Sequence, residues 1–410
     1  MESAREQGTI SEILRDSGIT YRPQPEDGDI TKIWAFGLKP GGFLSYYIGL
    51  DWLEEGKLAL RVSPKVESLD YQRMFAECLR SPAAAPYLGS AYDIRIDTPF
   101  IACPDEAFDI TPLIVLHYLT ILRELLSKPL RKDYLSREEN LKAKLKGKVM
   151  LSAHLAKNVF AQRPDRIMCR YQEFSTDCPE NRLLHSAYRM GLGCLRSWYG
   201  KNALEPARAM IFDDLERSFD GIGYISGAAG RIRFKHNPLY REYGEALRLA
   251  KLIMRIQGYR DLAASSRERL VPPYIIDMSK LFELYVLALM RAELGRSIQF
   301  QSSGRYGAVD FIDTRRRIVI DAKYKTKYGE GYVIEDVRQV SGYARDVGIL
   351  GKLGLKSEEE RDRVVDCLIV YPNPEAPKFD KEYYEQGDKD IEQFHRIRKL
   401  GIRLPIKESV

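Results

Sequence analysis

The chain has 410 residues, a formal net charge of +6 and 44% hydrophobic residues. It is too long for a single typical core, so we expect two or three domains with enough apolar residues to bury their cores. The small positive excess permits binding to a polyanion without requiring it. The longest apolar run, residues 113–122, is about half of the roughly 20 residues that span a bilayer, which excludes a membrane anchor there.

The 6 cysteines and 5 histidines form no ligand pattern. There is no C-x-x-C pair, and no histidine stands at ligand spacing from a cysteine, so neither a zinc site nor a disulfide framework is expected. The first residues lack the charged-then-apolar pattern of a signal peptide. Together with free thiols, this predicts a cytoplasmic protein.

Residues 1–145 are predicted to form a β-rich domain. Short alternating runs such as 58–62 indicate strands, and helices are expected at 71–79 and 109–126. Residues 128–148 are dense in charged side chains and mark a domain boundary or a solvated connector. An exposed helix of mixed charge and a DNA-binding strip are the alternatives for this segment.

Helices are expected to dominate residues 146–265, and helices alternate with strands in residues 266–410. In the middle region the helical periodicity covers 181–198, 205–219 and 240–256. The elements expected in the last region are, in order, a helix at 280–294, strands at 298–301, 308–313 and 318–325, a helix at 334–346, a strand at 365–371, a helix at 388–399 and a strand at 402–405.

Asp310, Asp321 and Lys323 lie on the two strands of a predicted β-hairpin. Its tip is near Arg315 and Arg316, so pairing across the tip places Asp310 opposite Asp321. Lys323 shares the face of Asp321, because side chains alternate along a strand. Opposed carboxylates repel unless a cation lies between them, and hard oxygen ligands suit Mg²⁺, or alternatively Mn²⁺.

This hairpin, in the order helix, three strands, helix, strand, is similar to the core of metal-dependent PD-(D/E)xK nucleases. The expected fold is therefore α/β (α+β, multidomain) with a restriction-endonuclease-like core at residues 266–410. In such a site Asp310, Asp321 and the backbone carbonyl of Ala322 would bind the metal, and Lys323 would orient water or stabilise the phosphorane. A solvated, salt-bridged hairpin is the alternative. Val309 stands where the class has its naming proline, a departure common among these nucleases.

Two further groups flank the hairpin. Glu283 lies in the first turns of the preceding helix, from which such nucleases often take another metal ligand; complementing the helix dipole is the alternative. Asp336, Gln339 and Tyr343 share one face of the following helix. Gln339 and Tyr343 form a Q-x-x-x-Y pattern that resembles the motif bordering the active site and the DNA backbone in RecB-type nucleases. The alternative is a surface glutamine beside a core tyrosine.

The chain resembles the McrC family, the nuclease subunit of 5-methylcytosine-specific McrBC restriction systems. The resemblance covers roughly residues 145–405, and the matching residues are 282–285 (FELY), Gln301, 309–311 (VDF), 320–325 (IDAKYK), 338–339 (RQ), 342–344 (GYA) and 370–372 (VYP), with suggestive upstream matches at 145–149, 169–174, Asp177 and 181–184. It implies a nuclease that is weak or inactive alone and works with a ring of AAA+ GTPase subunits (McrB-like, hexameric). That ring would bind DNA, recognise modified cytosine and translocate.

The resemblance also implies that residues 1–145 dock into the ring and stimulate GTP hydrolysis. Consistent with a separate GTPase, the sequence contains no G-x-x-x-x-G-K-[ST] loop. Four basic residues are candidates for phosphate contacts, each with an equally plausible solvated interpretation: Arg305, Lys325, Lys327 and Arg338.

The sequence thus predicts a Mg²⁺-dependent DNA endonuclease subunit that acts with a GTPase partner against modified foreign DNA. A similar nuclease coupled to another motor, or working in DNA repair, is a second hypothesis. A third is an adaptor that binds DNA without cutting it and activates an AAA+ partner. The intact trio of Asp310, Asp321 and Lys323 argues against the third.

Overall fold

The structure, a computed structural model, divides the chain into two compact units. The described residues are 2–5, 8–17, 36–39, 43–95, 97–103, 109–203, 213–225, 243–262, 270–304, 307–329 and 331–407. One unit combines Met1–Leu113 with Glu268–Val410, and the other is Ile114–Arg267. Both contain helices and strands, which confirms the mixed α/β class. The three predicted domain ranges stay a prediction. Among the described residues, no helix is both long and apolar enough to cross a membrane.

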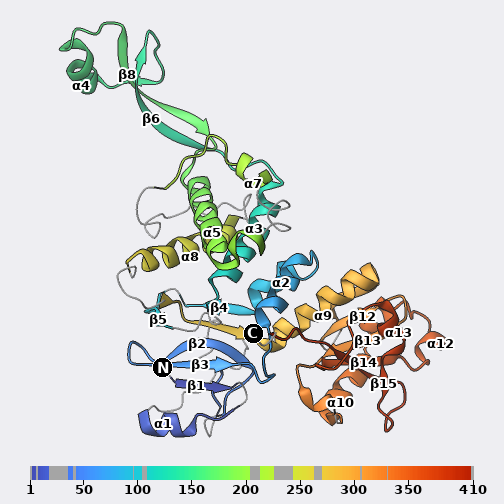
Figure 1. The fold of residues 1–410 in the computed structure, drawn as a ribbon. Coiled ribbons are helices and arrows are strands. Elements are labelled where there is room, and N and C mark those ends of the chain that lie inside the picture. The colour runs from blue at the N-terminus through green and yellow to red at the C-terminus, as the bar shows by residue number, and fades with distance from the viewer. Residues whose placement is uncertain are drawn as a thin grey trace. The chain divides into compact units, whose positions relative to one another are not determined.

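A five-stranded sheet lies near the amino terminus of the first unit (Figure 1). Its strands follow the order β1 (Glu2–Arg5), β3 (Leu58–Ser63), β2 (Tyr47–Glu54), β10 (Tyr274–Asp277) and β4 (Tyr92–Ile94). β10 is buried along its whole length between β2 and β4. The sequence does not reveal β10 as part of this sheet, because its partners are distant in the chain. The pair β5 (Ile101–Ala102) and β9 (Leu270–Val271) adds a short second sheet.

Helices accompany this sheet. The short helix α1 (Ser11–Ser17) follows β1, and the 3-10 helix η2 (Ala85–Ser90) precedes β4. The predicted helix at 71–79 is confirmed as α2 (Tyr71–Arg80). It begins at Asp70, whose side chain accepts a hydrogen bond from the backbone N–H of Arg73, so one of the unpaired amides of the first turn is satisfied.

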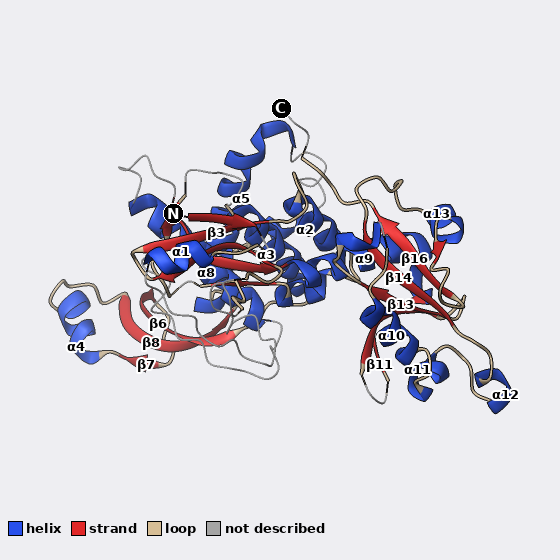
Figure 2. Ribbon diagram, turned by 90° about the horizontal axis from the view of Figure 1, so that it is seen from below, coloured by secondary structure: helices blue, strands red, loops and turns tan. Residues whose placement is uncertain are grey.

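A six-stranded sheet forms the carboxyl-terminal part of the same unit (Figure 2). The strands lie in the order β11 (Ile298–Ser303), β12 (Ala308–Asp313), β13 (Ile318–Ala322), β14 (Asp366–Pro372), β16 (Ile397–Ile402) and β15 (Lys389–Asp390). β13, β14 and β16 are parallel, and the other pairs are antiparallel. The helices of this part are α9 (Met278–Leu294), η7 (Gly295–Ser297), η8 (Thr326–Gly329), α10 (Ile334–Tyr343), α11 (Val347–Lys352), α12 (Glu358–Arg361) and α13 (Lys381–Gln386).

The predicted order of helix, three strands, helix and strand is therefore present, but the helix predicted at 388–399 is wrong. That segment holds β15, a turn and the start of β16. Apolar residues at Ile391, Phe394 and Ile397 mimic a helical spacing. Instead Phe394 N donates to Ile391 O in a turn, and β16 pairs with β14 from Ile397 onward. Pairing with a distant strand outweighs the local pattern.

The second unit contains the predicted helices of the middle region. α3 (Thr111–Leu126) enters it from the first unit, and α5 (Pro179–Ala203) packs against α8 (Tyr243–Leu262). These helices correspond to the predictions at 109–126, 181–198 and 240–256. The helix predicted at 205–219 lies partly outside the described residues, and α7 (Asp213–Arg217) is its described portion.

An arm built on β6 (Asp133–Lys142) and β8 (Arg166–Ser175) extends from these helices (Figure 1). The interpretation of 128–148 as a connector or helix is wrong, since all of β6 pairs with β8. Opposite charges face each other across the strands, as in Arg137 with Glu173 and Glu138 with Arg170. Such pairs stabilise a hairpin without an apolar face, so the sequence lacks the usual strand pattern.

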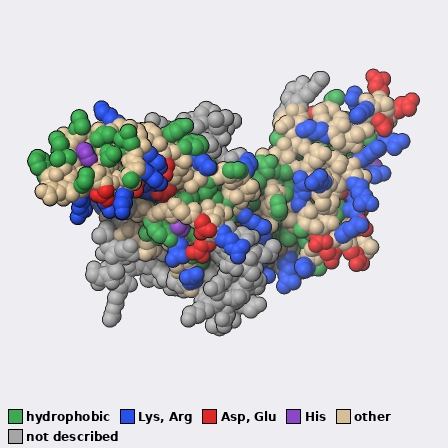
Figure 3. All heavy atoms as spheres, turned by 90° about the horizontal axis from the view of Figure 1, so that it is seen from above, with side chains coloured by type: hydrophobic (Ala, Val, Ile, Leu, Met, Phe, Trp, Pro, Cys, Tyr) green, Lys and Arg blue, Asp and Glu red, His purple; other side chains and the backbone are tan. Residues whose placement is uncertain are grey.

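The tip of the arm carries exposed apolar side chains. The tip is residues 145–160, which contain β7 (Lys148–Val149), α4 (Leu151–His154) and a π-helical turn, η4 (Leu155–Val159). Its exposed large hydrophobic residues are Leu145, Leu151, Leu155, Val159 and Phe160, and Phe160 is 82% exposed. Figure 3 shows such side chains gathered on the arm, at the left of the view.

Candidate functional site

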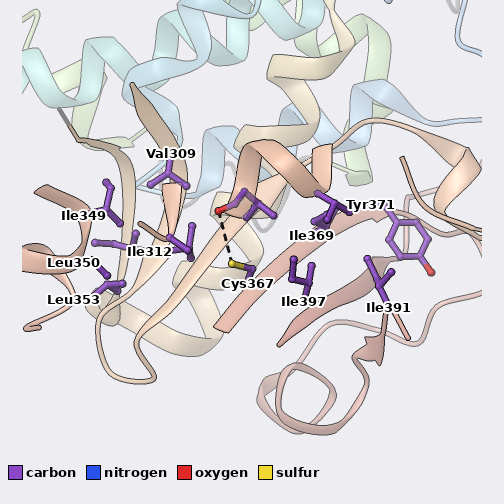
Figure 4. Close-up of a cluster of buried hydrophobic side chains, with 14 of the residues drawn as sticks. Val309, Ile312, Ile349, Leu350, Leu353, Cys367, Ile369, Tyr371, Ile391 and Ile397 are labelled. Atoms are coloured by element: carbon purple, nitrogen blue, oxygen red, sulfur yellow. Dashed lines mark hydrogen bonds between the residues drawn. The ribbon is translucent and has the colours of Figure 1, made fainter. Parts of the chain in front are cut away.

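The hydrophobic core of the six-stranded sheet fixes the strands and helix that carry the predicted site. Val309 and Ile312 of β12, Val319 of β13 and Val337 and Val340 of α10 belong to one buried cluster (Figure 4). The thiol of Cys367 on β14 donates to the backbone oxygen of Val340, with a sulfur–oxygen distance of 3.8 Å (Figure 4). α10 is thereby held against the sheet beside the hairpin.

The hairpin has the predicted register. Phe311 pairs with Ile320 and Asp313 with Ile318, so the same register places Asp310 beside Asp321. The backbone N–H of Ala322 donates to Asp310 Oδ2 at 2.8 Å, which ties this carboxylate to the opposite strand.

Lys323 follows directly after the end of β13 and turns toward the acids. Its backbone N–H donates to Val370 O at 2.8 Å, continuing the pairing with β14. Its Nζ lies 2.8 Å from Asp321 Oδ2. This contact is an ion pair without the angles of a hydrogen bond, so the buried Oδ2 has no hydrogen-bond donor among the described residues.

Glu283 joins the acidic group from helix α9. The helix begins at Asp277, whose side chain accepts hydrogen bonds from the N–H groups of Ser279 and Lys280. The pKa of Glu283 is raised to about 7, mainly by burial; a hydrogen bond with Gln301 lowers this pKa, and the charges of Asp277 and Asp321 raise it. The charge of the hairpin acid Asp321 therefore affects the pKa of Glu283.

The surroundings of the hairpin acids disfavour their ionised forms, so their pKa values are raised. Burial is the main cause that raises the pKa of Asp321, followed by the charge of Asp310, while Lys323 opposes both. Burial likewise raises the pKa of Asp310, with Glu283 as the next cause. For Lys323, burial is the largest single cause and lowers the pKa, but the attractions of Asp321, Asp310 and Asp336 together raise it overall. One lysine does not compensate three clustered acids.

The donor set fits a divalent cation by its chemistry. The raised carboxyl pKa values indicate that Lys323 does not supply enough positive charge, and Asp310, Asp321, Glu283 and the Ala322 carbonyl offer the hard oxygen atoms that Mg²⁺ prefers. Within the described ranges, no three acidic, histidine or cysteine side chains are already gathered around a common point for a metal. Side-chain adjustment would therefore accompany binding.

The predicted Q-x-x-x-Y pair contacts the lysine. Lys323 Nζ donates to Gln339 Oε1 at 2.8 Å, and Gln339 Nε2 donates to the hydroxyl of Tyr343 at 3.0 Å. The structure thus brings all six predicted side chains into one neighbourhood. Their catalytic and metal-binding roles stay predictions.

The family of the chain follows from comparison with known proteins. Residues 44–348, well over half of the chain and including all six site residues, match the family described as "McrBC 5-methylcytosine restriction system component". The chain belongs to this McrBC family. The predicted resemblance is confirmed at that level. No curated protein matches the chain.

Two solved McrBC structures are similar over most of the chain. A half-complex from a tetradecameric assembly of Thermococcus gammatolerans McrB AAA+ hexamers with bound McrC aligns with a TM-score of 0.40 at 16% identity, covering 98% of this chain and 94% of that chain. The cryo-EM structure of the Thermococcus gammatolerans McrBC complex aligns with a TM-score of 0.34 at 15% identity, covering 84% and 98%.

One contact of this McrBC-family site, between Lys325 and Asp336, is not identified by sequence reasoning. Lys325, a candidate phosphate contact, instead places its Nζ 2.8 Å from both carboxylate oxygens of Asp336. The only sequence signal was the position of Asp336 on the same helix face as Gln339. Arg338 is exposed, whereas Arg305 and the side chain of Lys327 lie outside the described part of the chain.

Proposed function

We propose that this McrBC-family chain is the DNA endonuclease subunit of a 5-methylcytosine restriction system, an McrC-like subunit that depends on Mg²⁺ and works with an AAA+ GTPase ring. The observation that carries the proposal is the buried pair Asp310 and Asp321 with Lys323 beside it. A hairpin of this kind in a six-stranded sheet flanked by helices fits a PD-(D/E)xK core. Burying clustered acids destabilises a fold, so such a cluster points to a functional site.

The proposed chemistry is hydrolysis of a phosphodiester bond. Asp310, Asp321, the Ala322 carbonyl and Glu283 would hold Mg²⁺. When bound, the ion supplies Lewis acidity toward the scissile phosphate and lowers the pKa of a coordinated water. The Lys323 ammonium, which has three N–H donors, contacts Gln339 Oε1 and Asp321 Oδ2, each at 2.8 Å. Lys323 would therefore direct a remaining N–H to the attacking water or to a non-bridging phosphate oxygen.

The proposed partner supplies the nucleotide chemistry that this chain lacks. The sequence has no phosphate-binding loop of the G-x-x-x-x-G-K-[ST] type, and the family is described as a component of a restriction system. The five exposed apolar residues at the arm tip form a surface of the kind that binds other proteins. We propose that residues 1–145 dock on the GTPase ring and that the arm tip adds an apolar contact.

Cleavage of plasmid DNA methylated at cytosine C5 tests the proposal. The assay contains Mg²⁺, GTP and the AAA+ subunit of the same restriction system. Asp321→Ala and Lys323→Ala should abolish cleavage while GTPase stimulation and partner binding persist. Asp366→Asn, which changes a partly exposed acid at the start of β14, is the matched control and should cleave normally. Cleavage by Asp321→Ala at the wild-type rate would end the assignment of the nuclease to these residues, whereas no cleavage by the wild type would favour the non-cleaving adaptor.

A further inference from the structure

A second set of ionic contacts lies next to the proposed catalytic lysine without belonging to the metal-binding acids. Lys325 Nζ is 2.8 Å from both Asp336 Oδ1 and Asp336 Oδ2, and the hydroxyl of Tyr328 donates to Asp336 Oδ2 at 2.8 Å. The Asp336 side chain is only 8% exposed, whereas that of Lys325 is 40% exposed. We call these three residues the α10 clamp.

We propose that the α10 clamp is a positioning device: it fixes helix α10 so that Gln339 holds the Lys323 ammonium in its working orientation. This inference rests on the proposed nuclease function. It assigns Lys325, Asp336 and Tyr328 a role in the rate of cleavage, although none of them would touch the DNA or the metal.

The geometry couples the clamp to the catalytic lysine. Lys323 and Lys325 are two residues apart after the end of β13, and the backbone N–H of Lys325 donates to Lys323 O at 2.7 Å. Their partners Gln339 and Asp336 are three residues apart on one face of α10. Two lysines of one short segment therefore bind two successive positions of one helix face, so loss of one contact shifts the other.

The first turn of α10 is held by the contacts of Asp336 with Lys325 and Tyr328. Its N-cap residue, Val333, makes no side-chain hydrogen bond to the free amides of the first turn. Asp336, in that first turn, is bonded to Lys325 and Tyr328. An acid at a helix start is usually explained by the helix dipole, which operates here too. The dipole alone does not require the paired lysine and the buried hydroxyl.

The other side of the clamp is rigid. Tyr328 is fully buried in the cluster of Figure 4, and its ring lies 5.6 Å from that of Tyr371 on β14. Lys399 of β16 donates through Nζ to the backbone oxygens of Tyr328 at 2.6 Å and Gly331 at 3.0 Å. Asp336 is therefore anchored to a segment that the sheet itself holds in place.

A double-mutant cycle separates a positioning role from a phosphate contact. Lys325→Met, Gln339→Ala and the double variant are assayed for single-turnover cleavage of methylated plasmid with Mg²⁺, GTP and the AAA+ subunit. Lys325→Met should slow cleavage about 10- to 100-fold, as is usual for residues that orient catalytic groups, with KM for DNA unchanged. The double variant should be no slower than the slower single variant, because both remove the same restraint. Lys325→Arg, which can still pair with a carboxylate at two points, should recover most of the rate.

Other outcomes overturn the inference. Effects that multiply in the double variant would show that Lys325 does not act through Gln339. A raised KM with an unchanged rate and a weaker salt dependence would make Lys325 a phosphate contact. Arg396→Met, which removes an exposed ion-pair partner of Asp366 in the same sheet, is the control and should change neither parameter.

Folding and the proposed function are checked separately. If Lys325→Met does not fold, the same cycle uses Tyr328→Phe, which removes only the hydroxyl that donates to Asp336. Asp321→Asn is assayed in parallel. Wild-type cleavage by Asp321→Asn would refute the nuclease site itself, whereas multiplicative effects on cleavage that depends on Asp321 would refute only the clamp.

Discussion

The carboxylates of Asp177 and Asp321 differ in how far their surroundings compensate their negative charge. In the second unit, Asp177 accepts hydrogen bonds from Arg182 Nε at 2.7 Å and from the backbone N–H of Gly223 at 2.9 Å, and it also pairs with Arg137. The hydrogen bond from Arg182 is the main cause that lowers the pKa of Asp177 to about 2. In the first unit, Asp321 faces other acids and a single lysine, and its pKa is raised.

The difference separates an acid that the fold compensates from acids that are proposed to bind a cation. Asp177 is compensated by the fold itself, so it stabilises the folded state at neutral pH. Asp321 is only partly compensated by Lys323, so its charge costs folding free energy that a bound cation would offset. A residue whose environment works against its ionised form is where a ligand is expected.

Among the predicted effects, the largest is the loss of DNA cleavage when Asp310 is replaced. Asp310→Asn should reduce cleavage of methylated plasmid by on the order of 10²-fold or more, because a ligand and part of the transition-state electrostatics are lost. Its thermal midpoint without metal should be equal to or above that of the wild type, since a repelled buried charge is removed. A variant that is both unstable and inactive would indicate a structural acid instead.

Removal of the metal should have the next largest effect. Without Mg²⁺ the acids repel, and a cation bound only by the folded state at a hundred times its Kd stabilises it by about 2.7 kcal/mol. Thermal unfolding with EDTA and with Mn²⁺ or Mg²⁺ measures this shift, and cleavage should stop in EDTA. An equal shift in Asp321→Asn would place the ion elsewhere.

Replacing the compensated acid should change stability and spare the chemistry. Asp177→Asn removes the charge from several hydrogen bonds and should destabilise the second unit by about 1–3 kcal/mol. Urea unfolding measures the loss. Stabilisation of the first unit by Mn²⁺ should remain as in the wild type. No loss of stability in this variant would contradict the view of Asp177 as a structural acid.

The smallest predicted effect is the pH dependence of the stability difference between the wild type and Asp177→Asn. The folded pKa of Asp177, about 2, lies below its ordinary value of 3.8, so the folded state binds its proton less readily than the unfolded state does. Its contribution is therefore fully present above about pH 4 and is lost as the pH falls toward 2. The stability gap between wild type and Asp177→Asn should narrow over that window. A gap that stays constant would assign the effect to packing.

The local sequence pattern predicts the hairpin. Elements whose pairing partners lie far away in the chain are not predicted. The turn at 314–317 sets the register that places Asp310 beside Asp321, so a short stretch of sequence suffices. β10 and the segment 388–399 take their structure from strands far away in the chain. The arm escaped prediction because charged pairs replace an apolar face on β6.

In the candidate site, too, sequence reasoning does not identify contacts that form only in the folded structure. Asp310, Asp321 and Lys323 are predicted from the hairpin register together with the flanking acid and helix, and Gln339 is predicted from the Q-x-x-x-Y pattern. Lys325 is predicted only as a phosphate contact or a solvated lysine, because its contact with Asp336 forms only once α10 is packed on the sheet. Sequence reasoning thus identifies the proposed reacting groups but not the contacts around Asp336 that are proposed to orient them.

The central claim is that the partly compensated acids around Asp321 form a centre for metal-dependent DNA cleavage. The most direct test is cleavage of methylated plasmid over a series of Mg²⁺ concentrations, with GTP and the AAA+ subunit, by wild type, Asp321→Asn and Asp177→Asn. Wild type and Asp177→Asn should respond to Mg²⁺ in the same way at a temperature where both are folded, and Asp321→Asn should stay inactive throughout. Cleavage by Asp321→Asn at the wild-type rate at any Mg²⁺ concentration would contradict the claim.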